Sequence, residues 1–275
     1  MKDIYTFGRK PARRNYTIPD LRALKRSGKR LTMCNPGNLT ELKACVDAGI
    51  DTLTVWDNAV ESSREIAPNH FMGTGSTWGQ YRSNDEILAA AITCMEQGAD
   101  MFYTNRSLDA VEMLAKENIP VQAHMGLVPS ISIWCGGLRA YGRTADEAME
   151  IHRTFKRLEN VGCFAVEIEC VAEQTLNHLN DKTSIVTFSL GSGNAGDVIF
   201  LFMSDICGES DPAPKHAHAF GNLAPLHKQM YEERVTALEQ FQIETTEKRF
   251  PYAQQSIMMH PDEEDKLLEA LDKEA

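Results

Sequence analysis

The sequence lacks both an excess of positive charge and any long apolar run. Its 275 residues carry a formal net charge of −11, and the sequence pI is near 5.2. Nucleic acids and anionic membranes bind clustered positive charge, so this balance disfavours both as partners. No apolar stretch approaches the ~18 residues that a membrane-spanning helix needs. The first 20 residues also lack the apolar segment of a secretory signal, so we expect no membrane association.

The sequence also lacks the paired cysteines of metal and redox motifs. Its seven cysteines include no C-x-x-C pair, and most lie in apolar segments, where a thiol behaves as a small hydrophobe. We therefore expect reduced thiols and a cytoplasmic location. The one basic cluster is expected to be a solvated arm or a subunit contact rather than a phosphate site; it consists of Arg9, Lys10, Arg13 and Arg14.

What the sequence does contain is an alternation of short β-rich segments and amphipathic helices. Capping boxes at Ser83 to Glu86 and Thr144 to Glu147 predict helix starts, and glycines predict helix ends. Seven strands are predicted, at 30–34, 52–56, 70–75, 101–104, 121–124, 164–168 and 184–190. The eighth is poorly marked, with 217–220 as the candidate. This alternation predicts an α/β fold of parallel β/α units, a (β/α)8 TIM barrel, for which 275 residues is an ordinary length.

One domain is expected over residues 1–275, with a basic amino-terminal arm and an acidic carboxyl-terminal helix. A long helix over 226–241 is predicted to cover the barrel. The tail over 261–275 is rich in Asp, Glu and Lys, and Leu267, Leu268 and Leu271 lie on one side of it. This pattern predicts an amphipathic helix that docks on a neighbouring subunit or on its own barrel.

Active sites of such barrels collect at the carboxyl ends of the strands. The polar residues expected at that end are Asn35, Asp57, Thr74, Asn105, Arg106, His124, Glu169 and Ser192. Glu169 lies at the end of an apolar strand, where an unpaired carboxylate is costly, so we expect it to be catalytic or ion-paired. Glu167 is expected on the opposite side of that strand, at the surface or between helices.

Several other candidates leave alternatives open. His124 is either a catalytic group at the barrel mouth or a satisfied core histidine. Asp57 is a metal ligand, a substrate acceptor or a helix cap. The amides around Ser192 bind a carboxylate or phosphate, or form a plain turn. His216 and His218 share a face if they lie on a strand and could hold a metal, but neighbouring prolines favour a surface loop.

Specific motifs lie along most of the chain. They are Val-Trp-Asp-Asn at 55–58, Ala-His-Met-Gly-Leu-Val-Pro-Ser at 123–130, Gly-Gly-Leu-Arg-Ala-Tyr-Gly-Arg-Thr at 136–144, Ile-Glu-Cys-Val at 168–171 and Arg-Phe-Pro-Tyr at 249–252. Together with the opening segment 16–57, they resemble the ketopantoate hydroxymethyltransferase (3-methyl-2-oxobutanoate hydroxymethyltransferase) family. The resemblance implies a barrel of the phosphoenolpyruvate/pyruvate superfamily, assembled as a homo-oligomer, usually a decamer.

The resemblance also implies a reaction and roles for individual residues. The family forms an enolate of a small 2-oxo acid and adds a one-carbon unit from methylenetetrahydrofolate at C3. Glu169 matches the general base, His124 a substrate-contacting histidine, and Asp57 a carboxylate that binds Mg²⁺. Asn58 falls where the family has a serine that binds the substrate carboxylate.

The sequence departs from the family at other metal and substrate positions. The second metal aspartate falls on Gly75, and a lysine and a glutamate after the fourth strand fall on Tyr103 and Asn105. Because Mg²⁺ prefers carboxylates and only Asp57 remains, Mg²⁺ binding in the family's manner is disfavoured. Tyr103 and Asn105 are expected to contact substrate, and Arg106 to supply a fixed positive charge near the enolate.

Three functions are consistent with these observations. The first is a hydroxymethyltransferase-like enzyme that acts on a small 2-oxo acid. The second is a divergent, metal-independent C–C lyase or aldolase of the same superfamily. The third is a non-catalytic paralogue, and the retained Glu169 and His124 argue against it.

Overall fold

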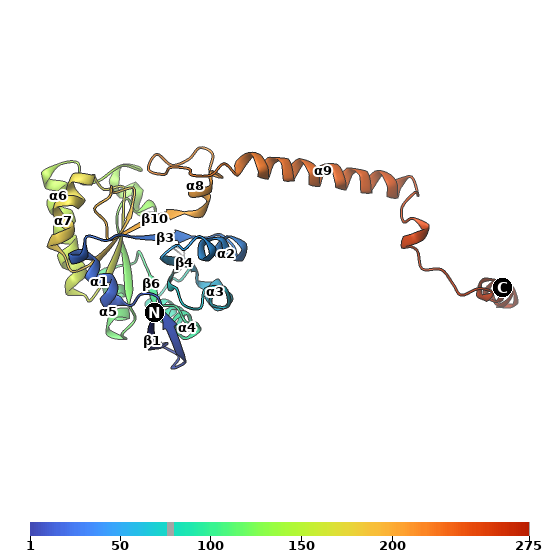
Figure 1. Ribbon diagram of the computed structural model, residues 1–275, viewed down its shortest axis with the longest axis horizontal. Coiled ribbons are helices and arrows are strands. Elements are labelled where there is room, and N and C mark those ends of the chain that lie inside the picture. The colour runs from blue at the N-terminus through green and yellow to red at the C-terminus, as the bar shows by residue number, and fades with distance from the viewer. Residues whose placement is uncertain (76–79, 275) are drawn as a thin grey trace. The chain divides into compact units, whose positions relative to one another are not determined.

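The fold is organised around a closed barrel of parallel strands. The structure is a computed structural model that describes residues 1–75 and 80–274. The chain divides into two compact units, Met1–Gly221 and Asn222–Ala275, and the barrel lies in the first (Figure 1). The predicted (β/α)8 barrel is therefore confirmed. The proposed single domain over 1–275 stays a prediction.

The barrel strands follow the chain order and close last onto first. They are β3 (Leu31–Asn35), β4 (Thr52–Trp56), β5 (Phe71–Gly75), β6 (Met101–Tyr103), β7 (Val121–Gly126), β8 (Ala165–Glu169), β9 (Val186–Leu190) and β10 (Val198–Phe202), which pairs with β3. All eight pairings are parallel. Every strand therefore delivers its carboxyl end to the same face of the barrel.

The expected position of the eighth strand was wrong. The strand is β10, whereas 217–220 has no regular secondary structure. Residues 191–197 connect β9 to β10 without a helix, so the alternation of strand and helix on which the expectation depended stops here. Side chains hold this connection in place instead, because Asp197 accepts a hydrogen bond from the Thr187 amide at 2.8 Å.

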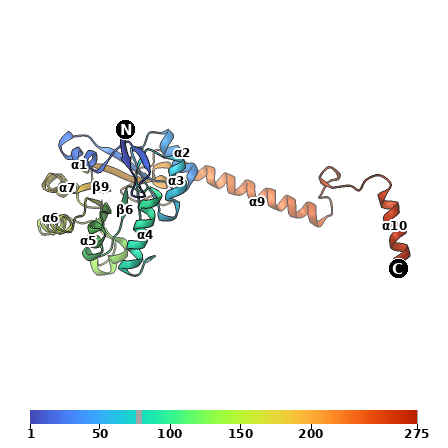
Figure 2. The same ribbon diagram turned by 90° about the horizontal axis from the view of Figure 1, so that it is seen from below.

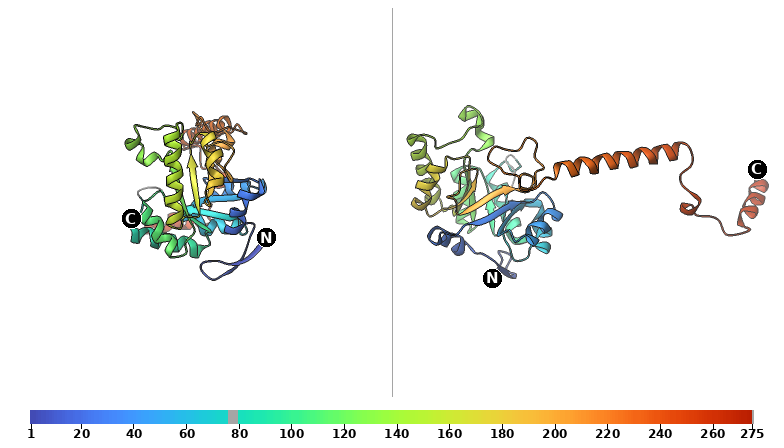
Figure 3. Two further views of the ribbon diagram at one scale, coloured as in Figure 1. Left: turned by 90° about the vertical axis from the view of Figure 1, so that its left-hand side faces the viewer. Right: turned by 45° about the horizontal axis from the view of Figure 1, so that its top comes forward.

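Helices surround the strands. They are α1 (Ile18–Ser27), α2 (Leu39–Asp47), α3 (Val60–Ile66), α4 (Asn84–Gln97), α5 (Leu108–Lys116), α6 (Ala145–Asn160) and α7 (Glu173–Leu179). Figures 1 and 2 show α2, α3 and α4 on one flank of the barrel and α6 and α7 on another, and Figure 3 shows the barrel from two further sides. The remaining connections contain η1 (Asp57–Ala59), η2 (Pro129–Cys135), η3 (Asn180–Lys182) and α8 (Met203–Cys207).

The two predicted capping boxes differ in the structure. At the start of α4, Ser83 accepts from the Glu86 amide and the Glu86 carboxylate accepts from the Ser83 amide, so this box is complete. At the start of α6, Thr144 accepts from the Glu147 amide, but the Glu147 carboxylate accepts from the amide of Arg143. The second capping box therefore has only one of its two hydrogen bonds, although the helix begins where it was predicted.

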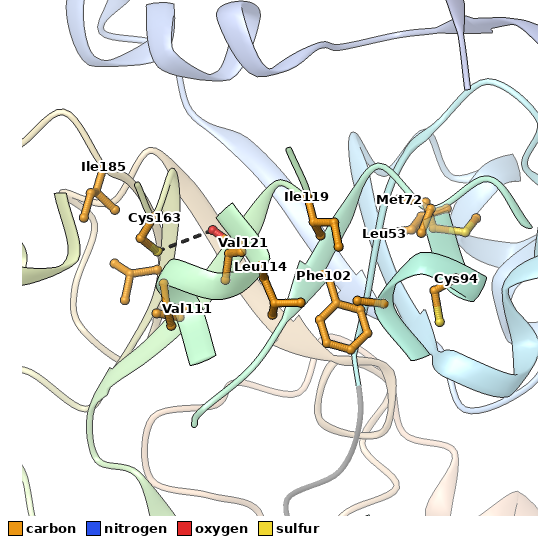
Figure 4. Close-up of a cluster of buried hydrophobic side chains, with 14 of the residues drawn as sticks. Leu53, Met72, Cys94, Phe102, Val111, Leu114, Ile119, Val121, Cys163 and Ile185 are labelled. Carbon is orange, nitrogen blue, oxygen red and sulfur yellow. Dashed lines mark hydrogen bonds between the residues drawn. The ribbon is translucent and has the colours of Figure 1, made fainter. Parts of the chain in front are cut away.

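Apolar side chains fill two regions, one between strands and helices and one inside the barrel. Figure 4 shows part of the first, where Phe102, Leu114 and Val121 pack together and the Cys163 thiol donates to the Val121 carbonyl at 3.4 Å. The second contains Met33, Met101, Phe188 and Phe200. A fully buried side chain of this size contributes about 1.5 to 3 kcal/mol. All seven cysteines are free thiols.

The basic amino-terminal segment is an anchored hairpin rather than a solvated arm. Strands β1 (Lys2–Tyr5) and β2 (Pro11–Arg14) pair antiparallel. Arg9, Lys10 and Arg13 are exposed as expected, but Arg14 is only 2% exposed. Its guanidinium pairs with Asp100 at 2.8 Å and donates to three backbone carbonyls. The expectation was wrong for Arg14 because a carboxylate distant in sequence compensates its burial.

The second unit contains α9 (Ala224–Thr246), η4 (Ala253–Gln255) and α10 (Glu263–Glu274). The predicted helix over 226–241 is confirmed and is longer at both ends. No described residue of α9 or α10 is buried within this chain. The expectation that the long helix covers the barrel stays a prediction. None of the described helices has the length and apolarity needed to cross a bilayer.

Candidate active site

The candidate site is built on the neighbouring strands β7 and β8. Their register places His124 opposite Glu167 and Gly126 opposite Glu169. Alternate residues on a strand share a face, so Glu167 and Glu169 project to the same side. The expectation that Glu167 points away was therefore wrong. Glu167 is 9% exposed and lines a cavity inside the barrel.

A chain of three hydrogen-bonded side chains runs across this face. The Tyr103 hydroxyl lies 2.8 Å from Nδ1 of His124, and Nε2 of His124 lies 3.1 Å from Oε2 of Glu169. Burial raises the pKa of Tyr103, and the charges of Glu167 and Glu169 raise it further, so the phenol keeps its proton and donates it to Nδ1. The imidazole then carries its proton on Nε2 and donates it to Glu169.

Glu167 adds a second carboxylate to the group. Its Oε1 lies 3.8 Å from Nε2 of His124, beyond hydrogen-bond distance. Burial raises the pKa of Glu167; His124 opposes this shift, and the charge of Glu169 adds to it. Among the residues that the structure describes, no lysine or arginine forms an ion pair with either glutamate. The site therefore holds two carboxyl groups and one imidazole without a compensating cation.

The cavity beside this group has a volume of about 230 Å³. Its wall combines polar groups with aromatic rings, and the lining residues are Asn35, Thr54, Val55, Trp56, Gly75, Tyr103, Asn105, Gln122, Glu167, Phe200 and Phe202. Glu167 and Tyr103 belong to this lining, whereas His124 and Glu169 do not. The Tyr103 hydroxyl is bonded to His124, which in turn is bonded to Glu169. A small apolar-walled cavity with a few polar groups is typical of a site for a small molecule.

A larger surface hollow, of about 850 Å³, lies between α1 and α6. Its lining contains exposed ions that pair with each other, such as Lys156 with Glu159 at 2.8 Å. The linked group of Tyr103, His124 and Glu169 is not part of it. We therefore place the candidate active site in the smaller cavity, where buried groups able to exchange protons lie together.

Two of the expected substrate residues lie in the cavity. Tyr103 lines it and is bonded to His124, while the Asn105 amide donates to Ser130 Oγ at 3.3 Å. Asn35, expected at this face, also lines the cavity and donates to the Thr54 carbonyl at 2.9 Å. The lining as a whole draws residues from seven of the eight barrel strands, all except β9.

Asn58 and Arg106, also expected to bind substrate, are not part of the cavity lining. Asn58 is exposed in η1. The Arg106 guanidinium donates to the carbonyls of Tyr81 and Arg82, at 3.1 and 3.2 Å. The structure thus gives Arg106 the role of holding the segment before α4, and the fixed charge expected near an enolate does not line this hollow.

Ser192 is likewise outside the cavity lining. It is fully buried, its hydroxyl donates to the Ile168 carbonyl, and the Val171 amide donates to it. These bonds hold the ends of β8 and β9 together. His216 lies with Nδ1 3.5 Å from Cys170 Sγ, and the described residues provide no set of three ligands around it or His218.

The residues that match the family's Mg²⁺ site do not fit that ion. Asp57 accepts hydrogen bonds from the Tyr81 hydroxyl and the Asn58 amide, both at 2.8 Å, and does not line the cavity. At Gly75, even a Cβ atom would lie 2.5 Å from the Tyr103 carbonyl oxygen, so this backbone has no room for an aspartate. Mg²⁺ needs several oxygen ligands, and the two positions provide one carboxylate already bonded elsewhere.

Among the residues that the structure describes, one other set of side chains could hold a metal ion. Ligand atoms of His124, Glu167 and Glu169 all lie within 4.8 Å of one another. A mixed set of imidazole and carboxylate suits transition metals better than Mg²⁺. The possible metal ligands are therefore the same groups that could transfer protons.

Two buried polar residues of the site were missed in the sequence, besides the apolar and aromatic residues of its wall. Glu167 lies two residues before Glu169, and strand alternation, correctly applied, places both on one face. Gln122 lies two residues before His124 on an otherwise apolar strand, and it is 1% exposed. Each of the two is a polar residue two positions before a catalytic candidate on the same strand. This spacing could have predicted that both lie on the face of the site.

A (β/α)8 barrel with proton-transfer groups gathered at the carboxyl ends of its strands has the architecture of a TIM-barrel enzyme. Solved structures with a similar fold include 2,3-dimethylmalate lyase, with 11% identity, a TM-score of 0.50 and coverage of 94% of this chain and 98% of that chain. Oxaloacetate acetylhydrolase aligns with 9% identity and a TM-score of 0.51, covering 79% of this chain and 85% of that one. These likenesses concern the fold alone.

A sequence model of the ketopantoate hydroxymethyltransferase family matches residues 65–253. The chain belongs to this enzyme family. The 3-methyl-2-oxobutanoate hydroxymethyltransferase of Pyrococcus furiosus is 33% identical over 180 residues, which span 63% of this chain and 60% of that protein. The enzyme of the same name from Deinococcus radiodurans is 26% identical over 286 residues, covering 94% of this chain and 99% of that protein.

Proposed function

We propose that this protein converts a small 2-oxo acid to its enolate in the barrel cavity and adds a one-carbon unit at C3, as a hydroxymethyltransferase. The observation that carries the proposal is the hydrogen-bonded series of Tyr103, His124 and Glu169, in which Tyr103 lines the barrel cavity. Membership of the ketopantoate hydroxymethyltransferase family supports the substrate class.

In this proposal Glu169 is the general base. Its carboxylate takes the proton from C3, the C–H electron pair becomes the C2–C3 π bond, and the carbonyl π pair moves onto the C2 oxygen. His124 orients Glu169 through Nε2–H, and Tyr103 fixes the tautomer of His124. C3 of the enolate then uses its C2–C3 π pair to form a bond to the methylene carbon of methylenetetrahydrofolate, the co-substrate, and the C2 carbonyl forms again. Both bonds from this carbon to the folate nitrogens break, water supplies the hydroxyl group, and tetrahydrofolate leaves with the two protons.

The cavity wall supports a small acid with an apolar part. Trp56, Phe200 and Phe202 offer ring surface to an aliphatic side chain, whereas Asn35 and Asn105 offer amides to oxygen atoms. A volume of about 230 Å³ suits a molecule of a few carbon atoms rather than a nucleotide. The reaction proposed here uses no Mg²⁺ at Asp57, because that carboxylate is bonded to Tyr81.

We also propose that the protein is a cytoplasmic homo-oligomer and that residues 1–275 of each subunit form a single barrel domain. Leu267, Leu268 and Leu271 on α10 are about half exposed within the single chain. Packing them against a neighbouring subunit would remove this apolar surface from water.

A metal-independent C–C lyase or aldolase is the second candidate. Glycine at position 75, where a Cβ would meet the Tyr103 carbonyl, favours it, because the family's second metal carboxylate has no place on this backbone. Both reactions pass through an enolate and use the same base. They differ in which acid donates its C3 proton.

The test follows solvent deuterium into C3 of 3-methyl-2-oxobutanoate and of pyruvate by NMR. We expect exchange with the wild type and a 10²- to 10⁴-fold slower rate in Glu169→Gln, the usual contribution of a general base. Glu65→Gln, an exposed glutamate on α3, is the matched control and should exchange at the wild-type rate. Exchange of another acid in place of 3-methyl-2-oxobutanoate would favour the lyase, and no exchange with any acid would favour a non-catalytic paralogue.

A further inference from the structure

Gln122 has a buried amide that the protein leaves unsatisfied. The residue is 1% exposed, and its side chain lines the barrel cavity. Its Nε2 has no hydrogen-bond partner among the residues that the structure describes. A buried donor without an acceptor costs free energy and calls for an explanation, and a ligand in the cavity provides one.

The other amides of the cavity already donate within the protein. Asn35 Nδ2 donates to the Thr54 carbonyl at 2.9 Å, and Asn105 Nδ2 donates to Ser130 Oγ at 3.3 Å. The hydroxyl of Tyr103 is bonded to Nδ1 of His124. Gln122 is therefore the side-chain amide of the described lining whose donor remains available to a bound molecule.

Positive charge is also missing from this wall. The described lining contains no lysine or arginine, and it includes the carboxyl group of Glu167. An oxygen atom that gains negative charge in the cavity must therefore be stabilised by neutral donors. A hydrogen bond to such an oxygen is stronger beside a buried aromatic ring such as Phe200 than in water.

The position of Gln122 selects the oxygen. Gln122 and His124 are on the same face of β7, two residues and about 6.6 Å apart along the strand. Consider a 2-oxo acid bound with C3 next to His124 and Glu169. Its C2, the neighbouring carbon, then lies closer to Gln122, and the oxygen on C2 can point toward the Gln122 amide.

We propose that Gln122 binds the C2 oxygen of the 2-oxo acid through Nε2–H and stabilises this oxygen as the enolate forms. This inference rests on the proposed function and assigns its electrophilic group. In this proposal a neutral amide takes the role of the cation in the family's reaction, and the proton removed from C3 still goes to Glu169. The negative charge on the C2 oxygen is then shared with the amide hydrogen bond.

Calorimetric titration of Gln122→Met tests the assignment, because methionine has a similar volume and no donor. We expect the affinity for 3-methyl-2-oxobutanoate to fall about tenfold or more, which corresponds to one lost hydrogen bond. The affinity for 3-methylbutanoate, which lacks the C2 oxygen, should be unchanged. Met125→Leu is the matched control, since Met125 is on β7 and faces the helices.

A second measurement separates ligand binding from a structural role. Removing an unsatisfied buried donor should leave the melting temperature of the unliganded protein unchanged or raise it. Equal affinity of wild type and Gln122→Met for the oxo acid would overturn the inference while leaving the proposed function intact. Equal losses for both acids, or a lower melting temperature, would also overturn it. If the wild type bound and exchanged no 2-oxo acid, the proposed function would fail first.

Discussion

At the amino ends of the strands Asp100 pairs with two guanidinium groups, whereas at the carboxyl ends Glu167 and Glu169 share one imidazole. Both ends of the barrel contain charged residues that are largely removed from solvent. At the first end, each charge has an opposite charge and hydrogen bonds. At the second end, the described residues provide no cation. The difference distinguishes groups that stabilise the fold from groups available for chemistry.

The amino-end arrangement is fully bonded. Asp100 Oδ1 lies 2.8 Å from Arg14 Nε, its Oδ2 lies 2.6 Å from Arg64 Nη2, and the Met72 amide donates to Oδ2 at 3.0 Å. Lys25 pairs with Asp197 at 2.8 Å near the start of β10. These contacts join segments that are far apart in the sequence and stabilise the barrel at the amino ends of its strands.

Desolvation favours the neutral form at both ends, but the neighbouring charges differ. Burial lowers the pKa of Lys25, and the opposite charge of Asp197 offsets part of this shift. Burial also raises the pKa of Glu167; His124 opposes this shift and Glu169 reinforces it. The carboxyl end therefore favours the neutral, protonated form of Glu167, which is typical of groups that exchange protons.

The largest expected effect comes from breaking the amino-end network. Asp100→Asn leaves Arg14 and Arg64 buried without a carboxylate, and we expect a loss of about 3 to 5 kcal/mol in the free energy of unfolding. Glu167→Gln at the other end should cost less than about 1 kcal/mol, because it removes an uncompensated buried carboxyl. Urea unfolding of the two variants measures both. Similar losses in both would abolish the distinction between the ends.

A smaller effect is expected at Glu159, which accepts from Thr183, Ser184 and Lys156 near the start of β9. Burial alone would raise its pKa, but these bonds hold it at about 2, below the ordinary 4.5. Because the folded-state pKa is depressed, its stabilisation is present above about pH 4.5 and is lost as the pH falls toward 2.

The melting temperatures of wild type and Glu159→Gln, measured from pH 6 to 2, test this linkage. The difference should shrink across the window from about 4.5 to about 2 and correspond to less than about 1 kcal/mol, since solvent screens a partly exposed group. A difference that stays constant or grows toward acid pH would show that the bonds to Glu159 do not depend on its charge.

The smallest effect is expected for Asp57. Its carboxylate is bonded to Tyr81 and lies outside the cavity lining, so Asp57→Asn and treatment with a chelator should each change C3 exchange less than about twofold. The rate of deuterium exchange with and without added Mg²⁺ is the measurement. A clear Mg²⁺ requirement that disappears in Asp57→Asn would place the metal back in the family's position.

Local sequence patterns predicted seven of the strands and most helix starts. Alternation and glycine stops apply within about 15 residues, so β4 and the complete capping box at Ser83 could be found without tertiary contacts. Strand β10 could not, because no helix separates it from β9. Its place depends on closure against β3 and on the bonds of Asp197.

The sequence by itself determined the barrel class. It also identified His124 and Glu169 as candidate catalytic residues, since each lies at the end of an apolar strand within a specific motif. Only the tertiary structure decided which polar groups meet. The side chains of Arg106 and Ser192 donate hydrogen bonds to backbone carbonyls, whereas those of Gln122 and Glu167 line the cavity. The physical reason is that local pattern fixes the face on which a side chain lies, while its hydrogen-bond partners come from strands far away in the chain.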